Sequence, residues 1–586
     1  MLKTVIQKNS YQDSITLMLL TKKIAAAEGV AKVSIMMGTP ANKDIFAAGG
    51  LATPELAQAG PNDIAIVMDI EDESIVAGLL AEIEQFLSKQ GQKDDQGQVD
   101  AAINSWEKAL AANPKANLAL FSIPGTYIET EADTALEAGK HVFIFSDNVS
   151  LEAEKKLKDK AREKGLLVMG PDCGTAMLGG LPLAFTNVLP AGNIGLVGAS
   201  GTGLQEISTQ IARRGAGISQ MIGTGGRDLS EEVGAVTMKM AVAALAYDPN
   251  TQCLVVVSKP PAPKVKEEIL SLLRAMNKPA IVHFVGENFP AHEEGLYYAD
   301  SLEEAAELAV QVGRGEKPAA CPPETLAAEA LPGRKICGLY AGGTLAGEAA
   351  ALMTRAMKCD VELHDHPEGF MFRFDGHQVI DLGDDAYTQG RPHPMIDPQN
   401  RLEFIQKTAG EDSVGVVLLD LVLGYGASDD MAGALVPAIR EVMDKAAAKG
   451  REIRFIATVC GTDLDPQGLD GQKKILTEAG VLVAPSNASA VATALKIIGF
   501  DLHWTEKAVG PVQGPAAGAV PQPAAPVDEL LKSSPVPINI GVRSFTKPFE
   551  DMGRDYVQFD WRPLAGGDVE LQKILNFLNR YEEEGR

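Results

Sequence analysis

The sequence predicts an α/β protein made of several parallel-sheet domains, and three observations lead to this prediction. Short apolar strands alternate with helical stretches almost throughout the 586 residues. Two strands, in NIGLVGA and CLVVVSKPP, are apolar nearly without interruption, which is typical of central strands buried on both faces. Two strand-to-helix joints, in GLVGASGTGLQEIS and KICGLYAGGTLAGE, share the same order of strand, glycine-rich turn and helix.

Composition sets the general class of the protein. The length predicts about three to four domains, and a hydrophobic share of 45% is ordinary for a globular protein. The chain has neither an apolar run of about 18 residues nor the layout of a secretory signal. Its net charge of −25 argues against a nucleic-acid partner. Six scattered cysteines without a CxxC pair indicate reduced thiols, so we expect a cytoplasmic protein with no membrane partner.

Changes in composition suggest the domain boundaries. A polar stretch, SKQGQKDDQGQVD, and a Pro/Ala-rich stretch, GRGEKPAACPPETLAAEALPG, are predicted to be linkers. The predicted units are a small α/β domain (1–90), a Rossmann-like domain (91–190), a flavodoxin-like domain (191–312), a second flavodoxin-like domain (333–505), a Pro/Ala/Gly tether (508–526) and a C-terminal segment (527–586).

The glycine-rich joint around Ser200 has a physical explanation in anion binding. The first N–H groups of a helix lack partners inside the helix, and the helix dipole adds partial positive charge there. Small residues such as Gly201 let a phosphate approach these groups. The alternative is a tight turn that needs glycine only for its shape, and the joint by itself does not decide between the two.

Several longer motifs resemble a known family. Residues 117–290, with LLVMGPDCG, GLVGASGTGLQEIS and MIGTGGRDLSEEVG, resemble the α subunit of succinyl-CoA synthetase. Residues 333–500, with VIDLGDD, VVLLDLVLGYG and ATVCGTDLDPQG, resemble the CoA-ligase domain of its β subunit. Together with GRPHPMID and DWRPLAGGD, the fused halves resemble the FdrA family of acyl-CoA synthetase-like proteins. The resemblance implies Rossmann-like and flavodoxin-like domains of the succinyl-CoA synthetase type, a CoA-binding-like second domain and no ATP-grasp domain.

The chain departs from that family at its catalytic histidine. No Gly-His-Ala-Gly loop follows KPAIVHFVGENFPAHEEG, and we expect His283 and His292 to be core or surface residues. Lys259 stands where the resemblance puts a glutamate beside that histidine. The change argues against a travelling phosphohistidine and favours a fixed phosphate that the lysine neutralises. The alternative is a solvent-exposed lysine before a proline turn.

The resemblance implies one anion pocket shared by the two halves. Helix starts in the first half would face a helix start in AGGTLAGE of the second half, and their backbone dipoles would stabilise one oxyanion. The predicted phosphate-binding residues are Ser200, Gly201, Thr202, Gly225, Gly226, Gly342, Gly343 and Thr344, and the predicted catalytic residues are Lys259 and Arg227.

A proline-rich run, YTQGRPHPMIDPQNR, is the candidate for substrate recognition. An arginine fork such as that of Arg391 suits a carboxylate, and His393 lies beside it among prolines that fix the backbone. We assign Arg391, His393, Gly461 and Thr462 to substrate binding. The alternative is a rigid loop whose arginine pairs with a neighbouring acid.

No metal site is predicted. His364 and His366 in LHDHPEG share one side of an extended segment, but no third ligand follows at a suitable spacing. The resemblance also assigns no definite cofactor, and it leaves CoA or a nucleotide as the candidates.

The resemblance implies a subunit of a carbamoyl- or acyl-transferring enzyme. In the oxamate carbamoyltransferase type, in purine and allantoin breakdown, oxamate and carbamoyl phosphate interconvert with oxalurate and phosphate. The implied partners are an acyl or carbamoyl phosphate, a small acid and further subunits. Two alternatives remain: an acyl-CoA synthetase of the nucleoside-diphosphate-forming type with a separate ATP-grasp chain, and a non-catalytic binding or scaffold protein. We expect the apolar strands of the C-terminal segment to dock a partner subunit, or else to fold back on their own ligase half.

Overall fold

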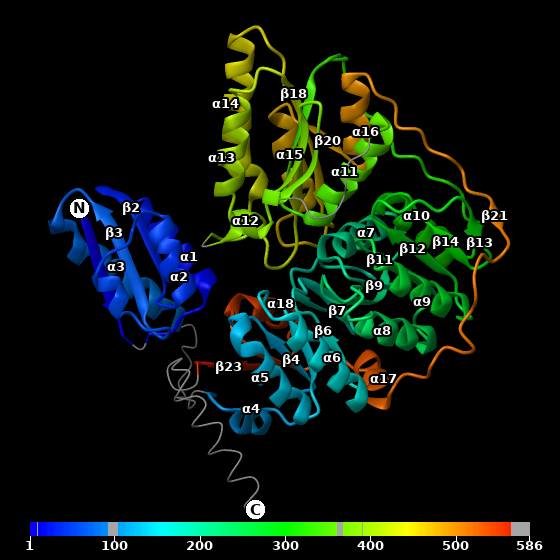
Figure 1. Cartoon of the computed structure of the whole chain (residues 1–586), viewed down its shortest axis with the longest axis horizontal. Helices are drawn as coiled ribbons and strands as arrows, with labels where there is room; N and C mark the ends of the chain where they lie inside the picture. Colours follow the sequence, from blue (N-terminus) through cyan, green and yellow to red (C-terminus); the bar gives the residue numbers. More distant parts are fainter. Residues whose placement is uncertain (9, 92–102, 360–366, 390, 564–586) are drawn as a thin grey trace, which may run out of the picture.

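The computed structural model describes residues 1–8, 10–91, 103–359, 367–389 and 391–563. The described strands form four sheets, which confirms an α/β fold with several parallel-sheet units. Figure 1 shows the first unit, in blue, beside the three others, which pack together. The His364–His366 stretch lies outside the described residues.

The N-terminal unit has a three-stranded antiparallel sheet in the order β1-β3-β2. Helices α1 and α3 cover an apolar face of the sheet, where Leu20 of α1 packs in one cluster with Ile35 and Ile66 of the strands, all fully buried. The elements are β1 (Leu2–Gln7), α1 (Ser14–Ala25), β2 (Val30–Met37), α2 (Pro40–Ala48), β3 (Ile64–Ile70) and α3 (Val76–Gly91).

The second unit has a five-stranded parallel sheet in the order β23-β22-β4-β5-β6. Three of its strands come from the expected second domain, whereas β22 and β23 come from the C-terminal segment. The elements are α4 (Trp106–Ala112), β4 (Leu118–Phe121), α5 (Gly125–Glu137), β5 (His141–Ile144), α6 (Leu151–Lys164), β6 (Val168–Met169), β22 (Pro537–Ile540), α18 (Lys547–Asp551) and β23 (Val557–Phe559).

The expectation of a separate docking segment is therefore wrong for the C-terminal strands. Strand β22 is an inner strand, and its Ile538 and Ile540 are fully buried in the core of the second unit. Trp561 is also buried, and its indole N–H donates to Glu131 on α5 at 2.8 Å. The segment folds back as anticipated in the alternative, but onto the second unit and not onto the ligase half.

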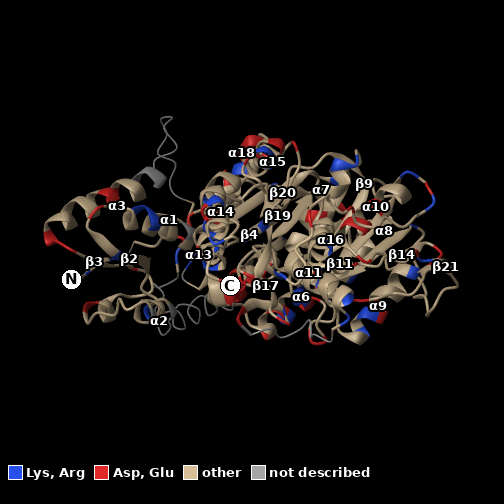
Figure 2. Ribbon diagram, turned by 90° about the horizontal axis from the view of Figure 1, so that it is seen from above, with Lys and Arg blue, Asp and Glu red and all other residues tan. Residues whose placement is uncertain are grey.

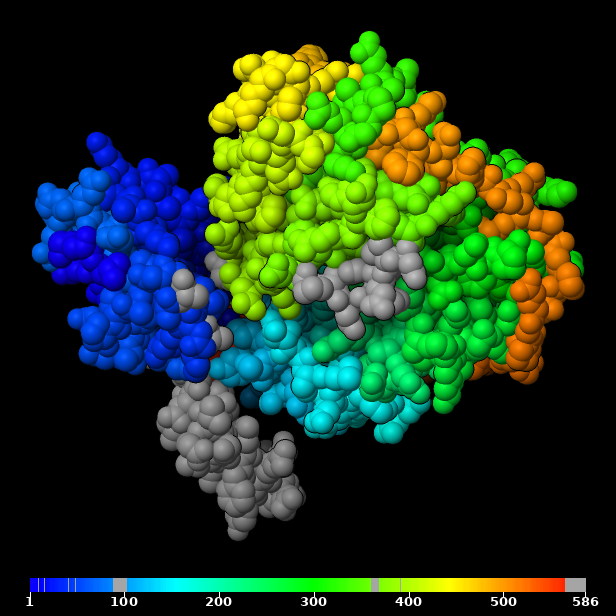
Figure 3. All heavy atoms as spheres, turned by 45° about the horizontal axis from the view of Figure 1, so that its top comes forward, coloured from blue at the N-terminus to red at the C-terminus, as the bar shows by residue number. Residues whose placement is uncertain are grey.

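The predicted tether delivers these strands across the molecular surface. After β21 (Val509–Gly510), which pairs with β13, the chain runs along the outside as the orange segment of Figure 3. On the way, the backbone N–H of Ala517 donates to the carbonyl oxygen of Ser271. Helix α17 (Ala525–Lys532) then buries Leu530 and Leu531 in the large apolar core of the protein.

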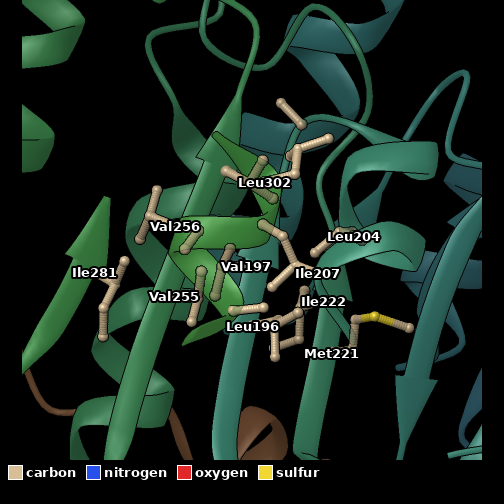
Figure 4. Packing of buried hydrophobic residues seen from close by; sticks show 14 of the residues in the cluster. Leu196, Val197, Leu204, Ile207, Met221, Ile222, Val255, Val256, Ile281 and Leu302 are labelled. Carbon is tan, nitrogen blue, oxygen red and sulfur yellow. The ribbon is translucent and has the colours of Figure 1, made fainter. Parts of the chain in front are cut away.

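The third unit is a nine-stranded mixed sheet with a central parallel part. Figure 4 shows how Leu196, Val197 and Val255 of its central strands pack against Leu204 and Ile207 of α7. The elements are β7 (Thr175–Leu178), β8 (Leu181–Ala184), β9 (Ala191–Gly198), α7 (Gly201–Arg213), β10 (Ile218–Gly223), α8 (Val236–Tyr247), β11 (Cys253–Ser258), α9 (Pro263–Arg274), β12 (Ala280–Phe284), β13 (His292–Glu293), β14 (Leu296–Tyr298) and α10 (Leu302–Gly313). Strands β7 and β8, which we expected in the second domain, belong to this sheet.

The fourth unit is a six-stranded sheet in the order β16-β17-β15-β18-β19-β20, parallel except for β16. Its elements are β15 (Lys335–Tyr340), α11 (Gly343–Met357), β16 (Phe370–Phe374), β17 (His377–Asp381), α12 (Asp385–Thr388), α13 (Gln399–Thr408), β18 (Val414–Val422), α14 (Met431–Ala448), β19 (Arg454–Cys460), α15 (Leu469–Glu478), β20 (Leu482–Ala484) and α16 (Asn487–Ile498). Figure 2 shows acidic and basic residues interspersed over the helices and loops. No helix among the described residues combines the length and apolar character needed to cross a membrane.

The third and fourth units are joined by buried polar contacts as well as apolar ones. Glu348 on α11 accepts from the N–H of Leu302 at 2.7 Å and from the Asn487 side chain at 2.8 Å. Burial raises the pKa of Glu348 to about 8, and nearby Glu206 and Glu303 add to the shift. The contact between the two halves thus contains a carboxyl group that is protonated at neutral pH.

Replacing Ile540 by alanine should lower the free energy of unfolding by about 2–4 kcal/mol, because it leaves a cavity in the core of the second unit. Thermal or urea unfolding measures the loss. Val512→Ala, at a position of the tether that is 54% exposed, is the control and should change little. Wild-type stability in Ile540→Ala would mean that β22 is not part of the folded core.

Glu348 should make the protein less stable as the pH rises. Its pKa is higher in the folded chain (about 8) than in the unfolded chain (4.5), so the folded state binds the extra proton between these values. Stability should fall across that window by up to roughly 1.4 kcal/mol per pH unit. Urea unfolding at several pH values should show this slope reduced in Glu348→Gln and unchanged in Glu441→Gln, an exposed position on α14. Equal slopes in all three proteins would contradict the assignment.

Candidate functional site

The carboxyl ends of strands from three sheets meet at one place. We call it the three-sheet junction and define it by Asp172 after β6, Ser200 after β9, Lys259 after β11, Gly342 after β15 and Asp381 at the end of β17. In open α/β sheets, ligands bind beyond the carboxyl ends of the strands. The junction is therefore the candidate site.

The starts of α7 and α11 touch each other in the junction. Ser200, the N-cap of α7, accepts from the N–H of Gly203 at 3.1 Å, and its hydroxyl lies 2.5 Å from that of Thr344 in the first turn of α11. A Cβ added at Gly342 would come within 2.9 Å of the Thr202 side chain. The glycines therefore permit the two helix starts to meet, as the sequence predicted for the two halves.

A buried ion pair supports the start of α11. The Asp420 carboxylate accepts from the N–H groups of Ala341 and Gly342 at 2.7 and 2.8 Å. Arg401 lies 3.3 Å from the same carboxylate, and both side chains are buried. The chain thus supplies its own anion to part of this helix start, and Gly342 does not have its N–H free for a phosphate.

The second predicted anion loop also holds a carboxylate of the chain. A Cβ at Gly226 would lie 3.1 Å from Oδ2 of Asp172, and one at Gly225 would lie 2.4 Å from the carbonyl oxygen of Pro171. Asp172 is open to solvent in a recess, and the surrounding protein raises its pKa to about 6 by desolvation, against the opposing charge of Lys259. The glycines allow close packing here, and whether they also bind phosphate stays a prediction.

Lys259 is the cation that acts on both halves. Its side chain is exposed and forms no ion pair or hydrogen bond with the part of the chain that the structure describes. Its charge opposes the burial that raises the pKa of Asp172 to about 6 and that of Asp381 to about 7. The lysine is thus available to a ligand that enters the junction.

Arg227, the other predicted catalytic residue, has a structural partner. Its guanidinium donates to Glu154 at 2.9 Å and to the carbonyl of Val149 at 2.8 Å. Glu154 in turn binds the buried Lys158, which also pairs with Asp228 at 2.8 Å. The network fixes the loop after β10 against α6. The guanidinium of Arg227 is therefore used to hold this loop in place, and ligand binding is not its main role.

The two residues of the proline-rich run separate in the structure. Arg391 is exposed and pairs with Glu403 at 3.0 Å, which agrees with the alternative of a surface ion pair. His393 lies at the junction, where a Cβ added at Gly383 would be 2.6 Å from its Nε2 and 3.1 Å from Oδ1 of Asp381. Burial lowers the pKa of His393 to about 4, so the ring is neutral.

Gly461 and Thr462 join the two halves. The carbonyl of Gly461 accepts from Arg213 on α7 at 2.9 Å, and the Thr462 hydroxyl donates to Val188 at 2.7 Å. Asp465 accepts from the N–H groups of Thr462 and Val188. These contacts leave both residues with an interface role, and substrate binding by them stays a prediction.

His283 and His292 are both internal, as expected. His283 is fully buried and its Nδ1 lies 2.9 Å from the carbonyl of Ala299, while His292 accepts from the N–H of Tyr298 at 3.1 Å. Burial lowers the pKa of both rings. Neither reaches the junction as a carrier of phosphate.

Sequence reasoning missed the acids of the junction. Asp172, Asp381 and Asp420 were not among the predicted site residues, although each had a signal. Asp420 interrupts the apolar strand VVLLDLV, and an acid inside such a strand needs a buried partner. Asp172 in GPDCG and Asp381 in VIDLGDD follow strand patterns, at the end where ligands bind.

Three family models match the chain. The CoA-ligase model matches residues 339–497, the CoA-binding domain model matches 191–286, and the model of the AllF heavy metal-associated domain matches 1–111. The CoA-binding match thus falls on the third unit, one unit later than the CoA-binding-like domain that we expected at 91–190.

The chain is also similar to curated proteins. It is 41% identical to the uncharacterized protein YahF of Escherichia coli over 514 residues, which cover 85% of this chain and 98% of YahF. It is 25% identical to the ADP-forming sulfoacetate-CoA ligase subunit SauD of Bilophila wadsworthia, over 30% of this chain and 61% of that protein. Among solved structures, a dinucleotide-forming acetyl-coenzyme A synthetase of Ca. Korarchaeum cryptofilum matches at 16% identity, over 65% of this chain and 82% of that one, with a TM-score of 0.28. A score this low supports no inference about the present chain.

The residues present do not suit a heavy metal in the N-terminal unit. Residues 1–111 contain neither cysteine nor histidine, the sources of the thiolate and imidazole ligands that most often hold such metals. The described parts of the chain also hold no group of three acidic, histidine or cysteine side chains arranged for a metal ion.

Proposed function

The chain belongs to the family of the Escherichia coli protein YahF, and from this premise we propose that it is an acyl-transferring subunit of the CoA-ligase type. Its CoA-binding and CoA-ligase regions stand in one polypeptide and resemble those of succinate–CoA ligases. In the proposed reaction, an acyl or carbamoyl phosphate formed elsewhere binds in the three-sheet junction and gives its acyl group to an acceptor.

The observation that carries the proposal is the meeting of the starts of α7 and α11 beside Lys259. Backbone dipoles at two helix starts stabilise negative charge without having to reorganise during the reaction. Among the described residues, the lysine acts on Asp172 and Asp381 through its charge but forms no ion pair or hydrogen bond with them, so its ammonium group can reach a phosphate. A preformed acyl phosphate needs neither the absent Gly-His-Ala-Gly loop nor an ATP-grasp domain.

We propose the second unit as the place for the nucleotide part of CoA, although the CoA-binding family model matches the third unit. Chain connections leave β22 and β4 in opposite directions, from β22 to β23 and from β4 to β5, so the crevice between them is a topological switch point. Gly541, at φ +125°, follows β22, and a Cβ there would lie 2.6 Å from the carbonyl oxygen of Ser122 after β4. The same sheet edge leads through Asp172 to the junction, which would let the thiol end of CoA reach Lys259.

The resemblance of the fused halves to FdrA-like proteins implies one specific substrate pair. We therefore propose oxamate and carbamoyl phosphate as the first pair to test, with further subunits required. The neutral His393 and partly protonated Asp381 suit an acceptor with an amide group, because both can exchange hydrogen bonds with it.

The decisive assay measures phosphate release by the chain purified together with its co-purifying subunits. The assay has two kinds of arm. The carbamoyl arm contains carbamoyl phosphate with oxamate, and the CoA arms contain acetyl or succinyl phosphate with CoA. We expect acceptor-dependent release in one arm. Release in the CoA arms alone would identify the acyl-CoA ligase, and release in none would favour a binding or scaffold protein.

Replacing Lys259 by alanine should raise the Kd for the acyl phosphate by about 10- to 100-fold, since a charged contact contributes about 1.5–3 kcal/mol. Titration calorimetry with carbamoyl phosphate measures the change. Lys264→Ala, an exposed position at the start of α9, is the matched control and should bind normally. Arg227→Ala should act less than Lys259→Ala, because Arg227 is already paired with Glu154. Unchanged affinity in Lys259→Ala would exclude the lysine from the site.

A further inference from the structure

Asp381 is placed in the junction by both of its oxygen atoms. Oδ1 accepts from the N–H of Gly383 at 2.9 Å. Oδ2 lies against the start of α11, where a Cβ added at Gly343 would be only 2.4 Å away. The carboxyl group is therefore held between the turn after β17 and the helix start that we assign to the phosphate, and it remains partly open to solvent.

Nε2 of His393 and Oδ1 of Asp381 both lie close to Gly383. Its Nδ1 accepts from the N–H of Met395 at 3.2 Å, so the ring proton is on Nε2. A Cβ added at Gly383 would lie 2.6 Å from this Nε2 and 3.1 Å from Oδ1 of Asp381. A side chain at residue 383 would occupy that position, which explains why the turn has a glycine there.

We propose that Asp381 accepts the proton of the attacking acceptor in the transfer reaction and that His393 is its positioning residue. This inference rests on the proposed function. As the S–H or N–H of the acceptor gives its proton to Asp381, its sulfur or nitrogen bonds to the acyl carbon. The carbon–oxygen bond to phosphate breaks, phosphate leaves with the electron pair, and Asp381 then returns the proton to water.

The surroundings of Asp381 match a base that works near neutral pH. Burial raises its pKa to about 7, the N–H of Gly383 and the charge of Lys259 oppose the rise, and the charges of Asp384 and Asp420 add to it. Asp420 is itself paired with the buried Arg401, whose charge helps to lower the pKa of His393. His393 stays neutral over this range because its own pKa is about 4. A catalytic base is most effective when its pKa lies near the working pH.

The test combines a titration that needs no substrate with a pH profile of turnover. Carbon NMR of the whole chain labelled at the aspartate carboxyl carbons, compared with Asp381→Asn, should show one carboxyl with a midpoint near pH 7. In the active preparation, the wild-type rate should rise through the same pH. Asp381→Asn should lose this limb and about 100-fold in kcat, whereas Asp384→Asn, which keeps the cap of α12, should keep kcat and keep the limb, with its midpoint moved to lower pH by the loss of a neighbouring negative charge.

His393 is tested with two amide variants that differ in one contact. Asparagine keeps an acceptor near Nδ1 but removes Nε2, and glutamine keeps a donor near Nε2. We expect His393→Asn to move the pH midpoint upward, because the charged carboxylate loses a nearby donor, and His393→Gln to restore it.

Two results would overturn the inference: a titration of Asp381 below pH 5, or a wild-type pH limb in Asp381→Asn. Absence of turnover with every substrate pair would count against the proposed function and this step together. The titration of Asp381 would then still show whether the base itself was assigned correctly.

Discussion

The site depends on the close approach of two helix starts from different halves of the chain. The contact between Ser200 and Thr344 is short, and there is no room for a side chain at Gly203 or Gly342. Two positive helix ends repel each other unless negative charge lies between or behind them. Asp420 supplies part of that charge to α11, so the protein can bring the helix starts together before any ligand arrives.

This arrangement also explains why the junction is rich in acids. Each carboxylate that accepts backbone N–H groups lowers the positive potential that a phosphate would feel, while Lys259 raises it again. The positive and negative contributions are nearly equal. The pKa of Asp172 is raised to about 6 and that of Asp381 to about 7, so both carboxyl groups change their charge near neutral pH. Entry of a phosphate would favour their protonated forms, because like charges repel at short range. Ligand binding and proton uptake are therefore coupled in this geometry.

The α/β class was predictable from the local sequence pattern, and the meeting of the two glycine-rich joints was implied by the family resemblance. Strand patterns and glycine-rich turns are local signals, and each was complete within one segment. The pairing of β22 with β4 was not predictable. It brings together Ile540 and Phe121, which are more than 400 residues apart, and no local sequence pattern indicates which strand β22 pairs with. Local reasoning placed β7 and β8 in the wrong sheet for the same reason.

Site residues were predictable only where they stood in a recognisable sequence motif. Ser200 and Lys259 stood in recognisable turns, whereas Asp381 acquired its role from Gly383, Gly343 and His393, which only the tertiary fold assembles. Arg391 had the residue type expected for a carboxylate site, but Glu403 was already within reach as a partner. A residue type thus indicates what a side chain is able to bind, and its neighbours decide whether it is free to do so.

The path of the C-terminal segment has a consequence for how the second sheet is completed. Strand β22 lies between β23 and β4, so the second unit lacks an inner strand until the chain has passed through the third and fourth units. Contacts between residues so far apart in sequence close slowly, because the entropy of ordering the intervening chain is lost before they form. The tether reduces that loss by running along the third unit, where β21 pairs with β13 and Ala517 donates to Ser271. The second sheet is therefore complete only once β22 and β23 have joined it beside β4, whereas β6, which leads to Asp172, pairs with β5 at the other side of the sheet.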